Sequence, residues 1–373
     1  MIYLTHYSHR STEDTTVIDD IPWPQRVHML PDTIKRLKSG MVYPPHRLVD
    51  SLNLAETKDH MDSNPVDGKT GFILAAGSQN WSGTSGRYDR NKDAQLHYDC
   101  KIPFLTLTNI YAGRIASILG IGDYVSTDAS ACASSLKVLM EVWNLMYNFG
   151  FGRVVVLTVE DSIHNSTLEF FGEAGACLTL EQEDKMKPSA FDDVNQGFYV
   201  GQGAAIAVFD REAVDFHAIL HGAYTSAELY DNPLGQREDG LGYQKAISGA
   251  LHLAKLAPDS VKLVKTHGTG TPVNNVAEKT ALESTLSSFV ATSYKQRIGH
   301  TVAASGLLET CLLFDDVKQG VVPAIPNRTV VDDVYLSHPV APPKGAILSL
   351  AAGMGNVYSA AIFSTGGCYA RSN

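Results

Sequence analysis

Three short segments of the chain each place one chemically reactive side chain among small residues. Cys132 lies in "DASACASS", His267 in "HGTGTP" and His300 in "GHTVAASG". A cysteine thiolate can hold an acyl group, and imidazoles can donate hydrogen bonds to a carbonyl oxygen or transfer a proton. A packed thiol or a backbone-bonded loop histidine explains each residue taken alone. The three together predict a Cys–His–His site for acyl-transfer chemistry.

The residues after Cys132 predict how its thiol is activated. Apolar side chains at Leu136, Leu139, Trp143 and Met146 have helical spacing. A helix that begins at or just after Cys132 places the sulfur beside unpaired backbone N–H groups and the positive end of the helix dipole. Both features are predicted to favour the thiolate and to lower the thiol pKa. The alternative is a buried structural thiol.

Both histidines are expected on tight loops. His267 follows the strand-like "VKLVK" and is flanked by Gly268 and Gly270, whereas His300 follows Gly299 and precedes a helix-like run. Polar groups at strand ends are where α/β proteins build their sites. We therefore expect both imidazoles at the same edge of the fold as the cysteine.

Strand-like and helix-like segments alternate along most of the chain, which predicts an α/β fold with mostly parallel strand pairing. The predicted strands are 71–77, 153–161, 204–210, 216–224, 261–268, 345–353 and 356–363, and residues 2–8 are a candidate for one further short strand. The predicted helices are 108–120, 134–149, 243–257, 276–290 and 304–320. Residues 11–27 are predicted as a loop and residues 121–126 as a turn. The pattern starts again near residue 215, which suggests two halves.

The composition excludes several classes of protein. The chain has 373 residues, 44% of them hydrophobic, and a formal net charge of −10, so it is globular and unsuited to binding nucleic acid. Two basic segments, Thr33–Gly40 and Gly86–Lys92, could meet an acidic partner, although a solvated surface is the simpler interpretation. No apolar run approaches the roughly 20 residues of a membrane span, and the N-terminus turns polar too early for a signal peptide.

The cysteines and the cofactor motifs add further exclusions. The five cysteines are widely spaced and odd in number, without a CxxC pair, which argues against a disulfide framework or a zinc site and favours the reducing cytoplasm. No GxGxxG, P-loop or HExxH motif occurs, so no dinucleotide, nucleotide or metal is predicted. Ser134–Lys137 matches the β-lactamase SxxK pattern but lacks the companion motifs, so we treat it as chance.

The three segments together resemble the β-ketoacyl synthases, the condensing enzymes of fatty-acid and polyketide assembly. "DASACASS", "HGTGTPVNNVAE" and "KQRIGHTVAASG" match this family's nucleophile, first-histidine and second-histidine segments in order and spacing. "AFDDVNQGFYVGQGAAIAVFD" resembles the segment that closes the family's first half. The resemblance runs from about Thr70 to Phe363, and its Cys–His–His set is typical of the elongating branch.

The resemblance implies a role for each site residue. Cys132 is implied as the nucleophile that accepts the acyl group, and His267 and His300 as the groups that bind and activate a malonyl thioester for decarboxylation. The backbone N–H groups of Cys132 and Met354 are implied as the oxyanion hole. Met354 also stands where the family's phenylalanine gates the acyl pocket, so the gating and the acyl preference are open.

Further positions match the family or depart from it. Lys295 and Glu278 match a charged pair that supports the site in the family. Tyr358 replaces the usual asparagine, and Gln202 replaces the usual glutamate of GEGA. The first 70 residues are read as lacking the family's opening strand with its glycine-rich turn. These departures indicate a divergent member, from a specialised fatty-acid or type II polyketide pathway.

The implied fold is the thiolase fold, a five-layer αβαβα sandwich of two duplicated halves that works as a dimer. Residues 1–212 form the half that carries the nucleophile, and residues 213–373 form the half that carries both histidines. The implied substrates are attached to the phosphopantetheine of an acyl carrier protein, and the resemblance implies no metal or free cofactor. The implied dimer contains two identical chains or pairs this chain with a related ketosynthase or chain-length-factor subunit.

Three functions stay open from the sequence. The first is a β-ketoacyl synthase that condenses malonyl-carrier with an acyl group held on Cys132. The second is a partner subunit, similar to a chain-length factor, with little condensing activity of its own. Such subunits typically lack the cysteine, so the presence of Cys132 with His267 and His300 favours the enzyme. The third is a decarboxylase or acyltransferase that uses the same residues without condensation.

Overall fold

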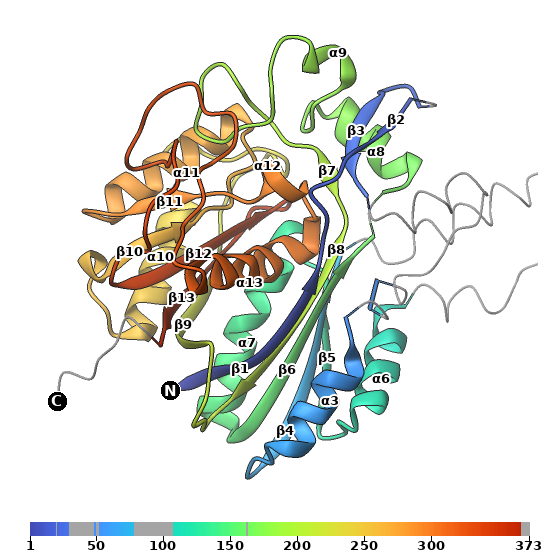
Figure 1. The fold of residues 1–373 in the computed structure, drawn as a ribbon, viewed down its shortest axis with the longest axis vertical. Coiled ribbons are helices and arrows are strands. Elements are labelled where there is room, and N and C mark those ends of the chain that lie inside the picture. Colours follow the sequence, from blue (N-terminus) through green and yellow to red (C-terminus); the bar gives the residue numbers. More distant parts are fainter. Residues whose placement is uncertain (20, 30–47, 50–51, 78–106, 162, 367–373) are drawn as a thin grey trace, which may run out of the picture.

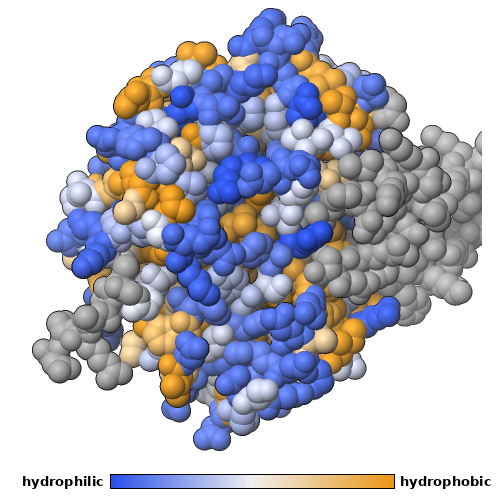
Figure 2. All heavy atoms as spheres, viewed as in Figure 1, coloured by the Kyte–Doolittle hydropathy of each residue, from blue (hydrophilic) through white to orange (hydrophobic). Residues whose placement is uncertain are grey.

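The structure is a computed structural model of the chain. It describes residues 1–19, 21–29, 48–49, 52–77, 107–161 and 163–366. The basic segments Thr33–Gly40 and Gly86–Lys92 lie outside these residues. Within the described ranges, no helix is long and apolar enough to cross a membrane. Figure 2 shows hydrophilic side chains over most of the viewed face, with hydrophobic side chains in small groups between them.

Ten strands form one continuous sheet with the order β11-β10-β12-β13-β9-β1-β8-β6-β4-β5. The first half contributes β1 (Ile2–Arg10), β4 (Lys69–Ala76), β5 (Tyr124–Asp128), β6 (Phe151–Glu160) and β8 (Gly203–Asp210). The second contributes β9 (Ala218–Ala227), β10 (Val261–Lys265), β11 (Val290–Thr292), β12 (Ala346–Gly353) and β13 (Val357–Thr365). If the five strands of each half are numbered in chain order, both halves have the same spatial order from the outer edge to the centre of the sheet: third, second, fourth, fifth and first. The shared order reveals a duplicated layout, joined where β1 pairs with β9.

Helices cover both outer faces of the sheet and fill the space between its halves (Figure 1). The central helices are α7 (Ser134–Phe149) and α13 (Ser305–Lys318), which pack on strands of both halves. The outer helices are α3 (Leu54–Ser63) and α6 (Thr108–Leu119) on the first half and α10 (Leu241–Ala254) and α11 (Pro272–Thr285) on the second. The predicted five-layer αβαβα sandwich is therefore confirmed.

The central layer holds the main hydrophobic core. Leu136 and Leu139 of α7 and Leu307 of α13 share one buried cluster with Val156 of the first half and Phe363 of the second. Such burial of leucine-sized side chains contributes about 1.5–3 kcal/mol each relative to exposure. Because α7 and α13 are the helices that begin beside the predicted site residues, this core fixes where those residues lie.

Smaller elements complete the chain around the entrance to the central layer. A second sheet combines β2 (Thr16–Ile18), β3 (Gln25–His28) and β7 (Val200–Gly201). The short helices are α8 (Asn165–Glu173), α9 (Leu180–Glu183), α12 (Lys295–Ile298) and the 3₁₀ turns Ala131–Ala133, Pro258–Ser260 and Val302–Ala304. The β2–β3 hairpin lies beside α8 in Figure 1.

Several sequence-based expectations about the fold are wrong. Pairing is parallel only between β4 and its neighbours β5 and β6 and between β10 and its neighbours β11 and β12; the other pairs of the ten-stranded sheet are antiparallel. For β12 and β13, the physical reason is connection length, because the short turn between them allows only an antiparallel hairpin.

The N-terminal region contains more strand than expected. An opening strand, β1, is present and lies in the middle of the sheet between β8 and β9. The candidate strand at residues 2–8 is thus confirmed and extends to Arg10, whereas the interpretation that the first 70 residues lack an opening strand is wrong. The predicted loop at residues 11–27 contains β2 and the beginning of β3, and the predicted turn at residues 121–126 contains the beginning of β5, a half-exposed edge strand.

Candidate active site

Cys132 lies in a strained turn at the start of α7. The preceding Ala131 has a φ of 47°, in the left-handed region that non-glycine residues avoid. Asp128, at the end of β5, accepts the Ser130 N–H at 3.0 Å, and Lys137 Nζ donates to Ser130 Oγ at 2.7 Å. These bonds hold the turn, so the Cys132 thiol is presented at the beginning of the central helix.

The second half contains a similar strained turn, which positions a histidine. Val302 has a φ of 38°, and the 3₁₀ turn that begins with it leads into α13, as the Ala131 turn leads into α7. Because the two turns meet in the central layer, His300 Nε2 lies 3.1 Å from Cys132 Sγ. Its other ring nitrogen, Nδ1, lies 2.9 Å from Ser305 Oγ. Ser305 can donate or accept, so it supports either tautomer of His300.

His267 lies on the loop between β10 and α11. Glu278 of α11 accepts the backbone N–H groups of His267 and Gly268 at 2.6 and 2.9 Å. Gly270 has a φ of 76°, and a Cβ there would come within 1.9 Å of the Ser189 carbonyl oxygen, so only glycine fits this position. The loop brings the His267 ring perpendicular to that of His300, with centroids 5.7 Å apart.

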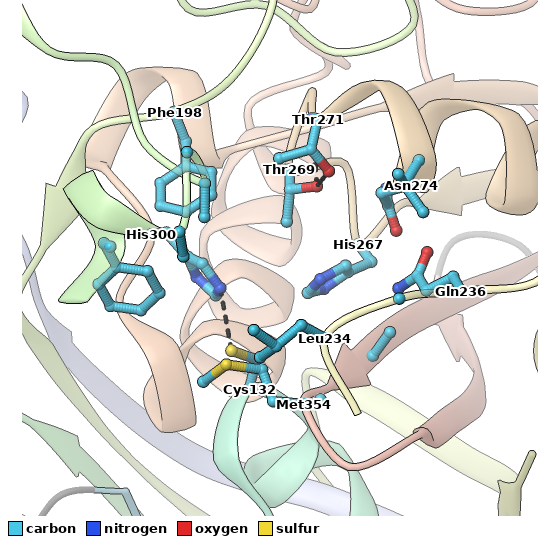
Figure 3. Close-up of a pocket in the computed structure, with 18 of the residues that line it drawn as sticks. Cys132, Phe198, Leu234, Gln236, His267, Thr269, Thr271, Asn274, His300 and Met354 are labelled. Atoms are coloured by element: carbon cyan, nitrogen blue, oxygen red, sulfur yellow. Dashed lines mark hydrogen bonds between the residues drawn. The ribbon is translucent and has the colours of Figure 1, made fainter. Parts of the chain in front are cut away.

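The cysteine and both histidines line one pocket of about 250 Å³ (Figure 3). Phe170, Phe171 and Phe198 form an aromatic wall, in which the Phe171 and Phe198 rings lie 5.9 Å apart and nearly perpendicular. A polar wall consists of Gln236, Thr269, Thr271 and Asn274. The pocket therefore offers an apolar surface and a hydrogen-bonding surface on either side of the reactive groups.

Burial dominates the electrostatics of the reactive groups. Burial raises the pKa of Cys132 to about 12, against the opposing effect of the Lys295 ammonium. The expectation that the helix start lowers this pKa is therefore wrong, because desolvation of the thiolate outweighs the favourable groups. Burial, followed by Lys295, holds the pKa values of His267 and His300 well below the ordinary range. The resting site thus contains a neutral thiol beside two neutral imidazoles.

Lys295 and Glu278, predicted as a supporting charged pair, are both fully buried beside the site but bind different partners. Lys295 Nζ bonds to Glu309 Oε1 at 2.8 Å, whereas Glu278 accepts the backbone N–H groups of the His267 loop. Lys265 Nζ bonds to the second Glu309 oxygen at 3.1 Å. The ion pair of the site is thus centred on Glu309, and Glu278 instead anchors a loop.

Met354 lies in the turn between β12 and β13 and lines the pocket with Cys132 (Figure 3). The preceding Gly353 packs on the nucleophile turn, where a Cβ would come within 2.6 Å of the Ser130 carbonyl oxygen. This close approach brings the Met354 segment to the cysteine. The roles of the Met354 N–H in an oxyanion hole and of its side chain as a gate stay predictions.

The two other departures from the family pattern form side-chain hydrogen bonds with acidic residues. Gln202 donates to Asp161 Oδ1 at 2.9 Å, and the Tyr358 hydroxyl donates to Glu228 Oε2 at 2.9 Å. The Tyr358 ring also meets the Tyr243 ring edge-on, with centroids 4.8 Å apart. Both residues therefore stabilise the surroundings of the site and do not line the pocket.

The sequence analysis missed four residues of the site: Lys265, Ser305, Glu309 and Gln236. Ser305 and Glu309 are fully buried on apolar helix α13, one turn apart. Buried polar side chains are retained where they have partners, so a glutamate at a core position of a helix is a signal of a charged site. Gln236 belongs to no motif and to no periodic pattern, so no sequence signal identifies it. Within the described part of the chain, no cluster of side chains is arranged to hold a metal ion.

Comparisons with known proteins identify the family of the chain. The family models "Beta-ketoacyl synthase, N-terminal domain" and "Beta-ketoacyl synthase, C-terminal domain" match residues 51–214 and 217–329. An oxytetracycline polyketide β-ketoacyl synthase 1 from Streptomyces rimosus is 28% identical over 257 residues, 64% of this chain and 60% of the relative. The 3-oxoacyl-[acyl-carrier-protein] synthase 2 of Synechocystis is 25% identical over 240 residues, 61% of this chain and 56% of the relative. The chain thus matches less than two thirds of the length of these relatives.

Solved structures share the fold over nearly the whole chain. A type II polyketide ketosynthase in complex with its acyl-carrier protein has a TM-score of 0.82 and 16% identity, covering 98% of both chains. The ishigamide ketosynthase/chain length factor has a TM-score of 0.80 and 16% identity, with the same coverage. The predicted thiolase fold is thereby confirmed. With the two family models matching consecutive parts of the chain, this protein belongs to the β-ketoacyl synthase family.

Proposed function

We propose that the chain is a β-ketoacyl-[acyl carrier protein] synthase that condenses malonyl-carrier with an acyl group held on Cys132. The observation that carries this proposal is the contact between His300 Nε2 and Cys132 Sγ, with the His267 ring facing both in the same pocket. A nucleophile in hydrogen-bond reach of a base, with that base oriented by a third group, is the arrangement that covalent acyl transfer requires. Ser305 is that third group.

The first half-reaction transfers the acyl group. Because the thiol is protonated at rest, its proton passes to His300 Nε2 while the sulfur attacks the thioester carbonyl. The resulting tetrahedral intermediate expels the phosphopantetheine thiolate, which takes the proton back from His300. The acyl group is then bound to Cys132 as a thioester, and the aromatic wall offers a surface for an apolar acyl chain.

The second half-reaction forms the carbon–carbon bond. Neutral His267 and His300 donate hydrogen bonds to the malonyl thioester oxygen, where negative charge develops as the bond to the carboxylate breaks and carbon dioxide leaves. The enolate carbon attacks the acyl carbonyl on Cys132. The cysteine thiolate is expelled and takes up a proton from solvent, and a β-ketoacyl chain two carbons longer is left on the carrier. This chemistry needs no metal or free cofactor.

The proposal includes the partners. The acyl carrier protein delivers both substrates, which the names of the carrier-dependent relatives support. We further propose that the chain works in the cytoplasm as a dimer, with a second copy or with a related subunit.

A second candidate is a partner subunit with little condensing activity. It is supported by the likeness to a ketosynthase/chain length factor complex and by Met354, which is 37% exposed at the pocket. Against it stands the assembled site, because a subunit that only shapes a product tunnel has no need of a cysteine in contact with a histidine. The first candidate is therefore the better supported.

The test is intact-protein mass spectrometry after mixing the chain with short and medium acyl-carrier proteins. We expect a mass gain equal to the acyl group in the native chain and none in Cys132→Ala. Adding malonyl-carrier should then release a β-ketoacyl-carrier. A chain that gains no mass with any acyl-carrier would overturn the stand-alone synthase. Restored loading on addition of a related subunit would then identify the partner-subunit function.

A further inference from the structure

Two lysines share one carboxylate beneath the active site. Lys265 at the end of β10, Lys295 at the start of α12 and Glu309 in α13 have fully buried side chains, each with 0% exposure. Lys295 Nζ lies 2.8 Å from Glu309 Oε1, and Lys265 Nζ lies 3.1 Å from Glu309 Oε2. Lys265 also donates to the Leu350 carbonyl oxygen at 2.7 Å. We call these three side chains the buried triad.

The mechanism above gives Lys265 no role, although burying a second ammonium is costly. A buried ion pair costs several kcal/mol of desolvation per ion before its Coulomb energy is counted, so a third charge on the same pair needs an explanation. Glu278 and Glu160 are also buried, and their carboxylates raise the pKa values of Lys265 and Cys132, respectively. Lys265 therefore supplies one of the two ammonium groups beneath the site.

The geometry of Glu309 shows how Lys265 can act at a distance. If Glu309 bonded to Lys295 alone, the two charges would largely cancel at the reactive groups. Because Lys265 occupies the second oxygen, the carboxylate is shared and the ammonium of Lys295 is left incompletely neutralised. A low-dielectric interior transmits such a charge more strongly than water does. After burial, Lys295 is the largest influence on the pKa values of Cys132, His267 and His300, and it lowers all three.

We propose that Lys265 is a positioning residue that sets the field of Lys295 at the active site. By sharing Glu309, it leaves Lys295 free to stabilise negative charge on the reacting groups, first the Cys132 thiolate and then the enolate. Only the enolate part rests on the proposed function, because the effect on the thiolate requires no substrate.

The charge of Lys265 is itself dependent on pH. Burial lowers the pKa of Lys265 to about 8, opposed by Glu309; Lys295 lowers this pKa further, and Glu278 raises it. Above pH 8, Lys265 therefore loses its proton, and Glu309 is left to neutralise Lys295. An uncharged Lys265 is electrostatically equivalent to a methionine, so the native chain and Lys265→Met should converge at high pH.

The experiment measures the rate at which iodoacetamide alkylates Cys132 in the full chain, read on the peptide that contains it. At pH 7.5, we expect Lys265→Met to react at least threefold more slowly than the native chain. We expect Glu309→Gln to react faster, because it removes the group that neutralises Lys295. Lys262→Met is the matched control, because Lys262 lies on the same strand and its ammonium donates a 3.5 Å hydrogen bond to the Ser288 carbonyl oxygen; this variant should match the native rate.

The opposite signs separate the proposed role from a merely structural one. If the buried triad only held the fold together, Lys265→Met and Glu309→Gln would change the rate in the same direction, and the proposal would fail. It would also fail if Lys265→Met matched the native rate at pH 7.5. If a single variant does not fold, the double variant Lys265→Met/Glu309→Gln, which keeps Lys295 unneutralised, should react at least as fast as the native chain.

The native chain alone provides a further test. Its logarithmic rate should rise by less than one unit per pH unit near pH 8, where Lys265 titrates, and a uniform slope of one would contradict the role. These outcomes are distinguishable from a failure of the proposed function. If the native chain accepts no acyl group, the synthase function is contradicted. If Lys265→Met is still alkylated more slowly than the native chain, the role of Lys265 is supported all the same.

Discussion

Nε2 of His300 lies 3.1 Å from the Sγ atom of Cys132, although the two residues are 168 positions apart in the chain. Each residue comes from one half of the duplicated fold, next to the strained turn that precedes a central helix. The contact therefore exists only when the two halves are packed on each other. It also separates the two histidines in function, because His267 has no hydrogen bond to the cysteine.

Replacing His300 should slow both half-reactions, whereas replacing His267 should slow only the second. We expect His300→Ala to slow acyl transfer to Cys132 by about 100-fold or more, the range typical of a lost general base. His267→Ala should accept the acyl group nearly normally and lose malonyl decarboxylation by a similar factor. Intact mass spectrometry measures the first step, and release of labelled carbon dioxide measures the second. Equal loss of both steps in both variants would contradict this division.

Gly353 controls the distance between the β12 end and the nucleophile turn. We expect Gly353→Ala to slow acylation of Cys132 at least tenfold, because its Cβ would come within 2.6 Å of the Ser130 carbonyl oxygen and 3.1 Å of the Ala133 nitrogen. Gly113 of α6, where an added Cβ meets nothing within 4 Å, is the matched control. Gly113→Ala should keep the native rate and gain up to about 1 kcal/mol of stability. An unchanged rate in Gly353→Ala would exclude this packing role.

Gln236 offers an unused hydrogen-bond acceptor to a substrate. Its Oε1 is buried in the pocket and has no hydrogen-bond partner among the described residues. A phosphopantetheine amide N–H could donate to it, and a neutral hydrogen bond contributes about 1 kcal/mol. We expect Gln236→Leu to raise the KM for acyl-carrier about fivefold while leaving iodoacetamide alkylation of Cys132 unchanged. An analogue whose amide N–H is replaced by oxygen should show no difference between the two chains.

Acid should destabilise the chain through buried histidines. Burial lowers the pKa of both His28 and His164 to about 4, whereas an unfolded histidine has a pKa of about 6.5. The unfolded chain therefore binds more protons between these values, and stability is lost as the pH falls from 6.5 towards 4. We expect His28→Leu to lose less stability than the native chain between pH 7.5 and 5, measured by urea unfolding. The exposed His338, changed to glutamine, is the control, and an equal loss in His28→Leu would refute the assignment.

The sequence by itself identified the reactive residues of the candidate site and the general plan of the fold. Cys132, His267 and His300 stand out because each lies in a segment of small residues whose local conformation depends on near neighbours. The helices after Cys132 and His300 and the strand before His267 follow from local apolar periodicity, and they occur as predicted. The family follows from these segments together, since their order and spacing are specific.

Only the tertiary structure decided which groups touch and how they titrate. The pairing of Lys295 with Glu309 and the sharing of Glu309 with Lys265 depend on how β10, α12 and α13 pack on one another, and the raised pKa of Cys132 depends on the burial of its thiol. The place of strand β1 in the sheet was also decided only by the tertiary structure, because its neighbours β8 and β9 come from distant parts of the chain. Local propensity acts between sequence neighbours, whereas desolvation and charge act between neighbours in space, which the sequence does not state.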